Sequence, residues 1–190
     1  MLLSTVLLTC LPLASALPKF EHRADTYLER RASDLGPQIR SQLDVLNASV
    51  IELTAAVNKF DGTLLGVLPQ SLAVIGAETK LDATIVKLTI LSKQTAPLTA
   101  DESESVVTTL ASLLTPIQTS LTAITDKYPE FKKTLESPIV LLDLKTLKAH
   151  TDDLITALTP KVTSDWAGFL TLGQGVLDSA FDAAIAVYSG

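Results

Sequence analysis

The pattern that decides the fold lies in residues 39–64, which read IRSQLDVLNASVIELTAAVNKFDGTL. Apolar side chains recur there at alternating intervals of four and three residues, and they are Ile39, Leu43, Leu46, Val50, Leu53, Val57, Phe60 and Leu64. Since an α-helix has about 3.6 residues per turn, this spacing places them on one face. The stretch therefore predicts a long amphipathic helix, and Asp61-Gly62 predicts its end.

Two further helices are predicted downstream. Residues 68–92 carry Pro69 in a first helical turn. The side expected to face inward carries Leu72, Ile75, Leu81, Ile85 and Leu88. Thr99 and Glu102 have the spacing of a capping box and start the third helix. Pro116 is expected to kink this helix, because proline lacks an N–H and crowds the preceding turn.

The rest of the chain predicts two more helices. They start at Ser137-Pro138 and Thr163-Ser164, and Tyr128-Pro129 starts a short helical turn before them. No segment after residue 31 alternates polar and apolar residues for long, so no strand is predicted. We therefore predict an all-α fold, a five-helix bundle with an apolar interior that is either packed or hollow.

Three glycines fall in the first half of the last helix, at Gly168, Gly173 and Gly175. Each weakens a helix by about 1 kcal/mol relative to alanine. They indicate either close contact with another helix or a mobile half-helix.

The N-terminus predicts two processing sites. Residues 1–16 combine a leucine-rich run with Ala14-Ser15-Ala16, the pattern of a signal peptide cleaved after Ala16. Residues 17–31 are polar and end in two arginines, so we expect a pro-segment removed after Arg31; an uncleaved tail is the alternative. Residues 32–190 would then form a single helical domain of a secreted protein. The one cysteine, Cys10, would leave with the signal peptide.

Composition excludes several classes of function. The chain has a net charge of −6 and no basic block, so we expect no nucleic-acid partner. Apolar residues make up 47% of the chain and aromatic residues 5%, so the apolar content is mostly aliphatic. The N-terminal apolar run is too short to cross a bilayer, and no integral membrane span is expected. Asn47-Ala48-Ser49 is a sequon that predicts glycosylation of Asn47.

Few residues are suited to catalysis. His150 is the one histidine after residue 31, and Asp153 is close enough along a helix to reach its ring. No G-x-S-x-G stretch presents a serine nucleophile to it, so we expect His150 to face solvent. The acidic residues lack the spacing of a metal site. The sequence therefore predicts no catalytic residue, no metal and no cofactor.

Local patterns carry a resemblance to a known family. They include Leu53-Thr54-Ala55-Ala56-Val57 leading into Phe60-Asp61-Gly62, and Asp178-Ser179-Ala180-Phe181 near the end. Over about residues 33–188 the chain resembles the fungal hydrophobic surface-binding protein A family, also called the cell wall galactomannoprotein family. The resemblance implies a five-helix bundle that takes fatty acids between its helices. It also implies a secreted or wall-associated protein that adheres to hydrophobic surfaces and, in some members, recruits a secreted esterase.

The chain departs from anchored members of that family. It ends in Tyr188-Ser189-Gly190 without the apolar tail of a GPI signal, and it has no Ser/Thr-rich stalk. We therefore expect a freely secreted form, or association with the cell wall without a GPI anchor.

The aliphatic excess and the resemblance together favour noncovalent capture of a fatty acid or another apolar ligand. The residues predicted to line the site are Leu46, Val50, Leu53, Val57, Leu72, Ile75, Leu114, Leu121, Leu154 and Phe169. Ser41, Ser120 or Thr151 would hydrogen-bond the carboxyl group. Two alternatives stay open: an adhesion protein that brings hydrolases to hydrophobic surfaces, and a secreted effector that binds a host protein.

Overall fold

A computed structural model of the chain describes residues 35–63 and 66–190. The proposed signal peptide, residues 1–16, and the proposed pro-segment, residues 17–31, lie outside the described residues. The same is true of the processing sites at Ala16 and Arg31 and of Leu64 at the end of the first apolar pattern.

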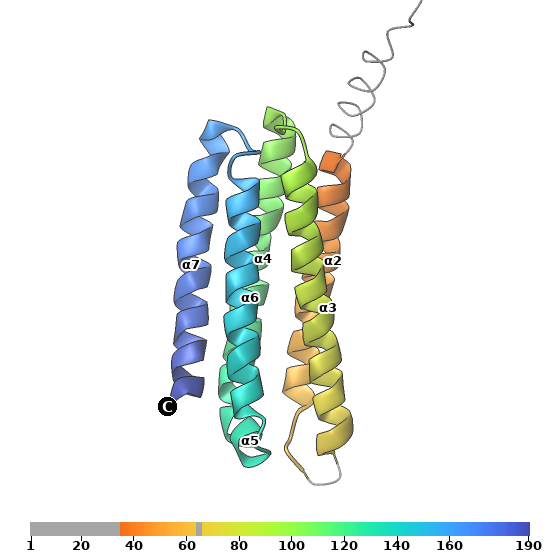
Figure 1. Ribbon diagram of the computed structural model, residues 1–190, viewed down its shortest axis with the longest axis vertical. Helices are drawn as coiled ribbons and strands as arrows, with labels where there is room; N and C mark the ends of the chain where they lie inside the picture. Colours follow the sequence, from red (N-terminus) through yellow and green to blue (C-terminus); the bar gives the residue numbers. More distant parts are fainter. Residues whose placement is uncertain (1–34, 64–65) are drawn as a thin grey trace, which may run out of the picture.

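Five long helices run side by side along the length of the molecule (Figure 1). They are α2 (Leu35–Lys59), α3 (Val67–Gln94), α4 (Ala100–Asp126), α6 (Ser137–Leu158) and α7 (Ser164–Ser189). A short helix, α5 (Tyr128–Lys133), crosses one end of the bundle between α4 and α6. The described residues contain no strand. The all-α five-helix prediction is confirmed, including the short helical turn at Tyr128.

The five long helices form a closed ring. α2 packs against α3 and α4, α3 packs against α6, and α7 completes the ring by packing against both α6 and α4. Each long helix therefore has two main neighbours, one on either side. Each of them contributes buried apolar side chains to a shared central axis, where the interior of the bundle lies.

The helix ends follow local chemistry. The Thr99 hydroxyl accepts a hydrogen bond from the Glu102 amide at 3.3 Å, and the Glu102 carboxylate accepts one from the Thr99 amide at 2.9 Å. The predicted capping box is therefore confirmed. Gly62 has a φ of 62°, a left-handed conformation that suits glycine after the end of α2. α4 continues as one helix through Pro116.

The apolar face of α2 is buried as predicted. Ile39, Leu43, Val57 and Phe60 are fully inaccessible, and the other described members of the pattern are almost so. At one end of the bundle the Phe60 ring stacks on Phe131 of α5, with centroids 4.3 Å apart. Both rings are buried, so this stack joins α5 to the core at that end.

The inward face predicted for the first half of α3 is wrong. Leu72 and Ile75 are 64% and 47% exposed, whereas Ser71 and Ala77 are buried. Each helical residue turns the chain by about 100°, so Leu72, nine positions before the buried Leu81, points about 180° away from it. The apolar residues surround α3, and the sequence pattern did not show which side faces inward.

Candidate functional site

A cavity of about 450 Å³ lies on the central axis of the ring. All five long helices contribute to its wall, from Leu46 on α2 and Leu81 on α3 to Phe181 on α7. Its lining is mostly hydrocarbon, and the lining residues with polar side-chain atoms are Thr108, Ser120, Thr151 and Trp166. This volume falls within the roughly 300–1,000 Å³ typical of sites for small organic ligands. The interior is therefore hollow as well as apolar.

Most of the residues predicted to line a site are brought together here. Those in the cavity wall are Leu46, Val50, Leu53, Leu114, Leu121, Leu154 and Phe169. Val57 is fully buried but lies outside the wall, and Leu72 and Ile75 are on the surface. Whether the lining residues contact a ligand stays a prediction.

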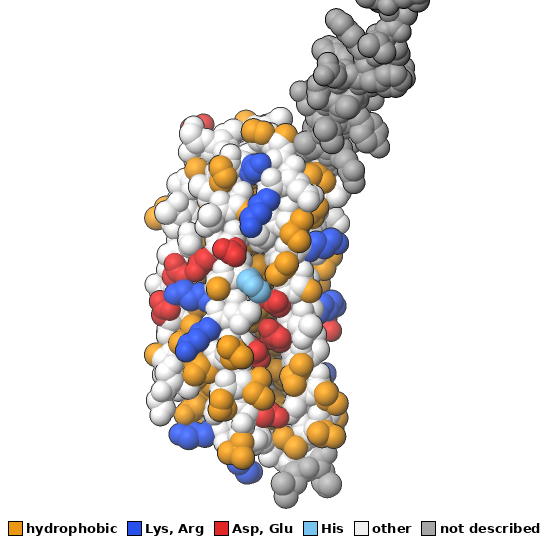
Figure 2. All heavy atoms as spheres, in the orientation of Figure 1, with side chains coloured by type: hydrophobic (Ala, Val, Ile, Leu, Met, Phe, Trp, Pro, Cys, Tyr) orange, Lys and Arg blue, Asp and Glu red, His pale blue; other side chains and the backbone are white. Residues whose placement is uncertain are grey.

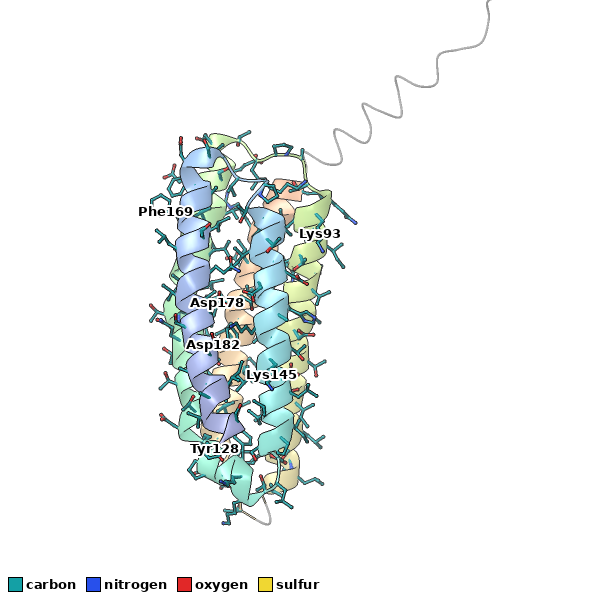
Figure 3. All side chains as sticks on the ribbon, turned by 60° about the vertical axis from the view of Figure 1, so that its left-hand side comes forward. Lys93, Tyr128, Lys145, Phe169, Asp178 and Asp182 are labelled. Atoms are coloured by element: carbon teal, nitrogen blue, oxygen red, sulfur yellow. The ribbon has the colours of Figure 1, made fainter. Side chains whose placement is uncertain are left out.

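The cavity opens between α4 and α7. The lining residues that α2, α3 and α6 supply are buried, except for Thr151, which is partly buried. The exposed ones all come from α4 and α7, and they are Thr108, Ala111, Phe169, Leu172 and Val176. In Figure 3, Phe169 projects outward from α7 on the side away from α6. We call these five residues the rim of the cavity.

Gly173 leaves room at this opening. A Cβ added there would meet only the Leu114 side chain, 4.0 Å away, and a Cβ at Gly168 or Gly175 would meet nothing within 4 Å. The glycines therefore do not mediate a close contact between helices, which removes one of the two predicted explanations. Only Gly173 borders the cavity. A larger side chain at this position would enter the space.

One residue that lines the cavity, Ser120, has a buried hydroxyl without a hydrogen-bond partner. Ser120 is 4% exposed. The Thr151 hydroxyl, by contrast, donates to the Leu147 carbonyl at 2.7 Å. Ser41, the third candidate for a head-group contact, is exposed on α2 and is excluded by its position. A buried hydroxyl without a partner costs free energy that a polar ligand atom could recover.

Hydrogen bonds fix α7 at both of its ends. At its last turn the Tyr188 hydroxyl donates to the Ile124 carbonyl on α4 at 2.6 Å. Before its first turn the Thr163 amide donates to the Ser103 hydroxyl on α4 at 3.1 Å. Between these points, Leu114 and Gly173 meet at the mouth of the cavity.

The opposite edge of α7 is joined to α6 by polar contacts. Lys148 of α6 lies 2.6 Å from Asp182 and 3.6 Å from Asp178, and the Gln174 amide donates to Asp152 at 3.1 Å. Charged side chains accordingly gather across the middle of the face formed by α3, α6 and α7 (Figure 2), and Asp178 and Asp182 lie along α7 beside α6 (Figure 3). α7 therefore has a polar edge toward α6 and an apolar edge toward α4.

A second polar cluster lies between α3 and α6. The His150 ring is 2.5 Å from Asp82 through its Nδ1 atom and is partly buried, which corrects the expectation that it faces solvent beside Asp153. Burial, followed by the charges of Asp143 and Asp82, raises the pKa of the neighbouring Glu78 to about 7. None of these side chains borders the cavity. Within residues 35–63 and 66–190, no group of acidic and histidine side chains is placed to hold a metal ion.

Asn47 of the predicted sequon lies on α2 beside the buried Leu46 and is itself partly exposed. Its glycosylation stays a prediction.

Known proteins with a similar sequence or fold include structures solved with fatty acids. A family model described as hydrophobic surface binding protein A matches residues 36–160. A search of curated proteins found no match. The solved structure of AFMP4P in complex with palmitic acid is 35% identical, with a TM-score of 0.77, and the match covers 80% of this chain and 99% of that one.

More distant solved structures share the fold. Ligand-binding domain 1 of the Penicillium marneffei MP1 protein, complexed with arachidonic acids, is 14% identical with a TM-score of 0.71 over 79% of this chain and 95% of that one. Domain 2 of the same protein, complexed with multiple arachidonic acids, is 13% identical with a TM-score of 0.71 over 79% and 93%.

Proposed function

The chain belongs to the hydrophobic surface binding protein A family, and from this premise we propose that it binds a long-chain fatty acid in the cavity enclosed by its helices. The observation that carries the proposal is the hollow interior itself, which is lined mostly by aliphatic side chains. The complex of AFMP4P with palmitic acid supports the choice of ligand, because that protein is 35% identical to this chain.

The cavity supplies the free energy through burial of the acyl chain. Each methylene moved out of water contributes about 0.8 kcal/mol. A chain the length of palmitate therefore gains on the order of 10 kcal/mol, part of which offsets the loss of translational and rotational freedom. Since about −8 kcal/mol corresponds to micromolar affinity, we expect dissociation constants in the micromolar range or below.

Ser120 orients the ligand in this proposal. Ser120 lines a largely apolar cavity, and its buried hydroxyl, which has no partner in the empty protein, donates to a carboxylate oxygen of the bound fatty acid. A hydrogen bond to a charged group is worth about 1.5–3 kcal/mol. Ser120 would therefore favour acids over hydrocarbons of the same length.

The function proposed is binding, without catalysis. The one described histidine pairs with Asp82 between α3 and α6, and neither residue borders the cavity.

We further propose that the protein is secreted, with residues 1–16 as the signal peptide and removal of residues 17–31 after Arg31. Adhesion to hydrophobic surfaces is a second function, favoured by the exposed side chains of Phe169 and Leu172.

Lipid extraction from the purified protein, followed by mass spectrometry, tests the proposal. We expect long-chain fatty acids in the extract. We also expect a delipidated sample to bind palmitate in a titration with a fluorescent competitor. A delipidated protein that stays folded and fails to bind palmitate, arachidonate or any other long-chain acid would refute the proposed function.

A further inference from the structure

The mouth of the cavity is bordered by large apolar side chains that face water. Phe169, Leu172 and Val176 are 58%, 70% and 41% exposed, and all three also line the cavity. Exposed apolar groups that continue directly into an apolar cavity form one surface from the outside of the molecule to its interior. Such a contiguous patch is typical of a site where the protein meets another apolar phase.

The two helices that form the mouth carry no positively charged side chain. Neither α4 nor α7 contains a lysine or arginine. Their middle parts, residues 105–125 and 166–177, contain no charged residue, and Glu104, Asp126, Asp165 and Asp178 directly flank these segments. An anionic surface would be repelled by those carboxylates, and nothing on the two helices would attract it. An uncharged apolar surface matches this face.

α4 is apolar in overall composition and uncharged over residues 105–125. Among the described helices it is the one that is long and apolar enough to cross a membrane by length and composition alone, and only a third of its most apolar window is buried. Its burial against α2 and α7 and its capping box identify it as a helix of the bundle wall. Beyond the rim its exposed side is polar but uncharged, with Ser112, Thr115, Gln118, Thr119 and Thr122, so the large exposed apolar side chains of this face come from α7.

We propose that the face formed by α4 and α7 docks on an uncharged lipid surface with the cavity mouth against it, so that the fatty acid passes directly between surface and cavity. This inference rests on the proposed function. The rim side chains leave water when the face docks, and the acyl chain then never crosses bulk water. α7 stays joined to α6 through Lys148 and Asp182 while its α4 edge meets the lipid.

The surface carries other exposed apolar residues that serve as controls. Leu142 on α6 is 64% exposed, close to the 70% of Leu172, but it does not line the cavity. Leu172→Asp therefore introduces a negative charge on the proposed docking face. Leu142→Asp introduces the same charge at similar exposure away from that face.

The test measures the transfer of fluorescently labelled palmitate from the full protein to phosphatidylcholine vesicles that carry a quencher. For the unchanged protein we expect the transfer rate to rise with vesicle concentration, because transfer occurs during contact. Leu172→Asp should slow transfer by about tenfold or more, since docking would desolvate a carboxylate, and should remove the dependence on vesicle concentration. Leu142→Asp should behave as the unchanged protein. Phe169→Gln tests a second rim position.

The outcomes separate this inference from the proposed function. If the unchanged protein binds palmitate in solution but transfers it at a rate independent of vesicle concentration, the docking inference is refuted and the proposed function stands. If it binds no fatty acid in solution, the proposed function fails. Docking by this face would also be overturned if Leu142→Asp and Leu172→Asp slowed the transfer of palmitate equally. The same holds if transfer to phosphatidylglycerol vesicles were faster than transfer to phosphatidylcholine vesicles.

Discussion

The Tyr188 hydroxyl donates a 2.6 Å hydrogen bond to the Ile124 carbonyl and so ties the last turn of α7 to the last turn of α4. Carbonyls in the last turn of a helix lack amide partners within that helix, and the Tyr188 hydroxyl supplies a donor from a neighbouring helix. Ile124 also lines the cavity. Beyond it, the rings of Tyr128, Tyr188 and Phe131 pack together. This contact therefore joins α4 and α7 at the end of the bundle where α5 lies, whereas Phe169 belongs to the other half of α7.

Replacement of Tyr188 by phenylalanine should destabilise the protein. Burial, followed by Glu130 and Tyr128, raises the pKa of Tyr188, so its hydroxyl is a neutral donor across the ordinary pH range. Loss of a hydrogen bond to a buried carbonyl costs about 1–3 kcal/mol. For a chain of this size we expect the melting temperature to fall by about 2–4 °C per kcal/mol. Thermal unfolding followed by circular dichroism would measure it, and an unchanged melting temperature would contradict the role of this bond.

The sequence predicted α2 well and the first half of α3 badly, and the reason is physical. On α2 the apolar residues are confined to one face, so their spacing identifies the buried side, as Leu43 and Val50 show. On α3 they surround the helix, and only tertiary packing decides that Ser71 turns inward and Leu72 outward. Helix periodicity alone holds no information about such a choice.

Only part of the cavity could be predicted from the sequence. The sequence indicated an aliphatic interior and named Ser120 as a candidate polar contact. Whether the interior is filled depends on how five helices close into a ring, which no local pattern encodes. Much of the α7 wall, including Leu170 and Leu177, was therefore missed, and the mouth at Leu172 was not foreseen. The signal that could have found it is the uncharged stretch of residues 166–177.

Ser120→Ala should weaken fatty-acid binding while stabilising the empty protein. The buried hydroxyl has no partner without ligand, so its removal should raise the free energy of unfolding by about 1 kcal/mol. Loss of its bond to the carboxylate should weaken palmitate binding about tenfold. Calorimetry and thermal unfolding measure the two effects. Ser112→Ala is the matched control, because Ser112 is exposed on the same helix and donates to the Thr109 carbonyl at 2.6 Å.

An unchanged affinity in Ser120→Ala, with palmitate still bound, would place the carboxyl group elsewhere. Thr151 would then be the next position to test, since it is the other hydroxyl on the inner wall.

Stability should fall as pH rises between about 4.5 and 7 because of Glu78. Its pKa rises from the ordinary glutamate value of 4.5 to about 7 in the folded protein, through burial and then through the charges of Asp143 and Asp82. The folded state therefore keeps a proton that the unfolded state releases in this interval, and each step up in pH favours unfolding. The side chain is partly exposed, so solvent screening reduces the effect to roughly 1 kcal/mol.

Glu78→Gln should remove this dependence. Thermal melts between pH 4 and 8 should show that the variant gains stability over the unchanged protein at pH 8 and loses the advantage at pH 4. Glu104→Gln, at an exposed position on α4, should leave the pH profile as it was. If the Glu78→Gln profile matches that of the unchanged protein, the α3–α6 cluster does not control the pH dependence.

Gly173→Leu should raise stability and abolish binding in the same molecule. Leucine is a better helix former than glycine by about 1 kcal/mol, so the melting temperature should rise by about 2–4 °C. Its side chain starts beside Leu114, where the glycine Cβ position is 4.0 Å from that residue, and it extends into the cavity. Palmitate should then bind at least about tenfold more weakly, since several methylenes lose their space.

Gly175→Leu provides the matched control for this change. It lies two residues further along α7, where an added Cβ meets nothing within 4 Å, and it does not line the cavity. It should show the same gain in melting temperature and bind palmitate as the unchanged protein does. Because the two variants share their effect on helix propensity, only the filling of the cavity separates them. If Gly173→Leu binds palmitate with full affinity, the acyl chain does not pass Gly173, and the mouth between α4 and α7 is not its path.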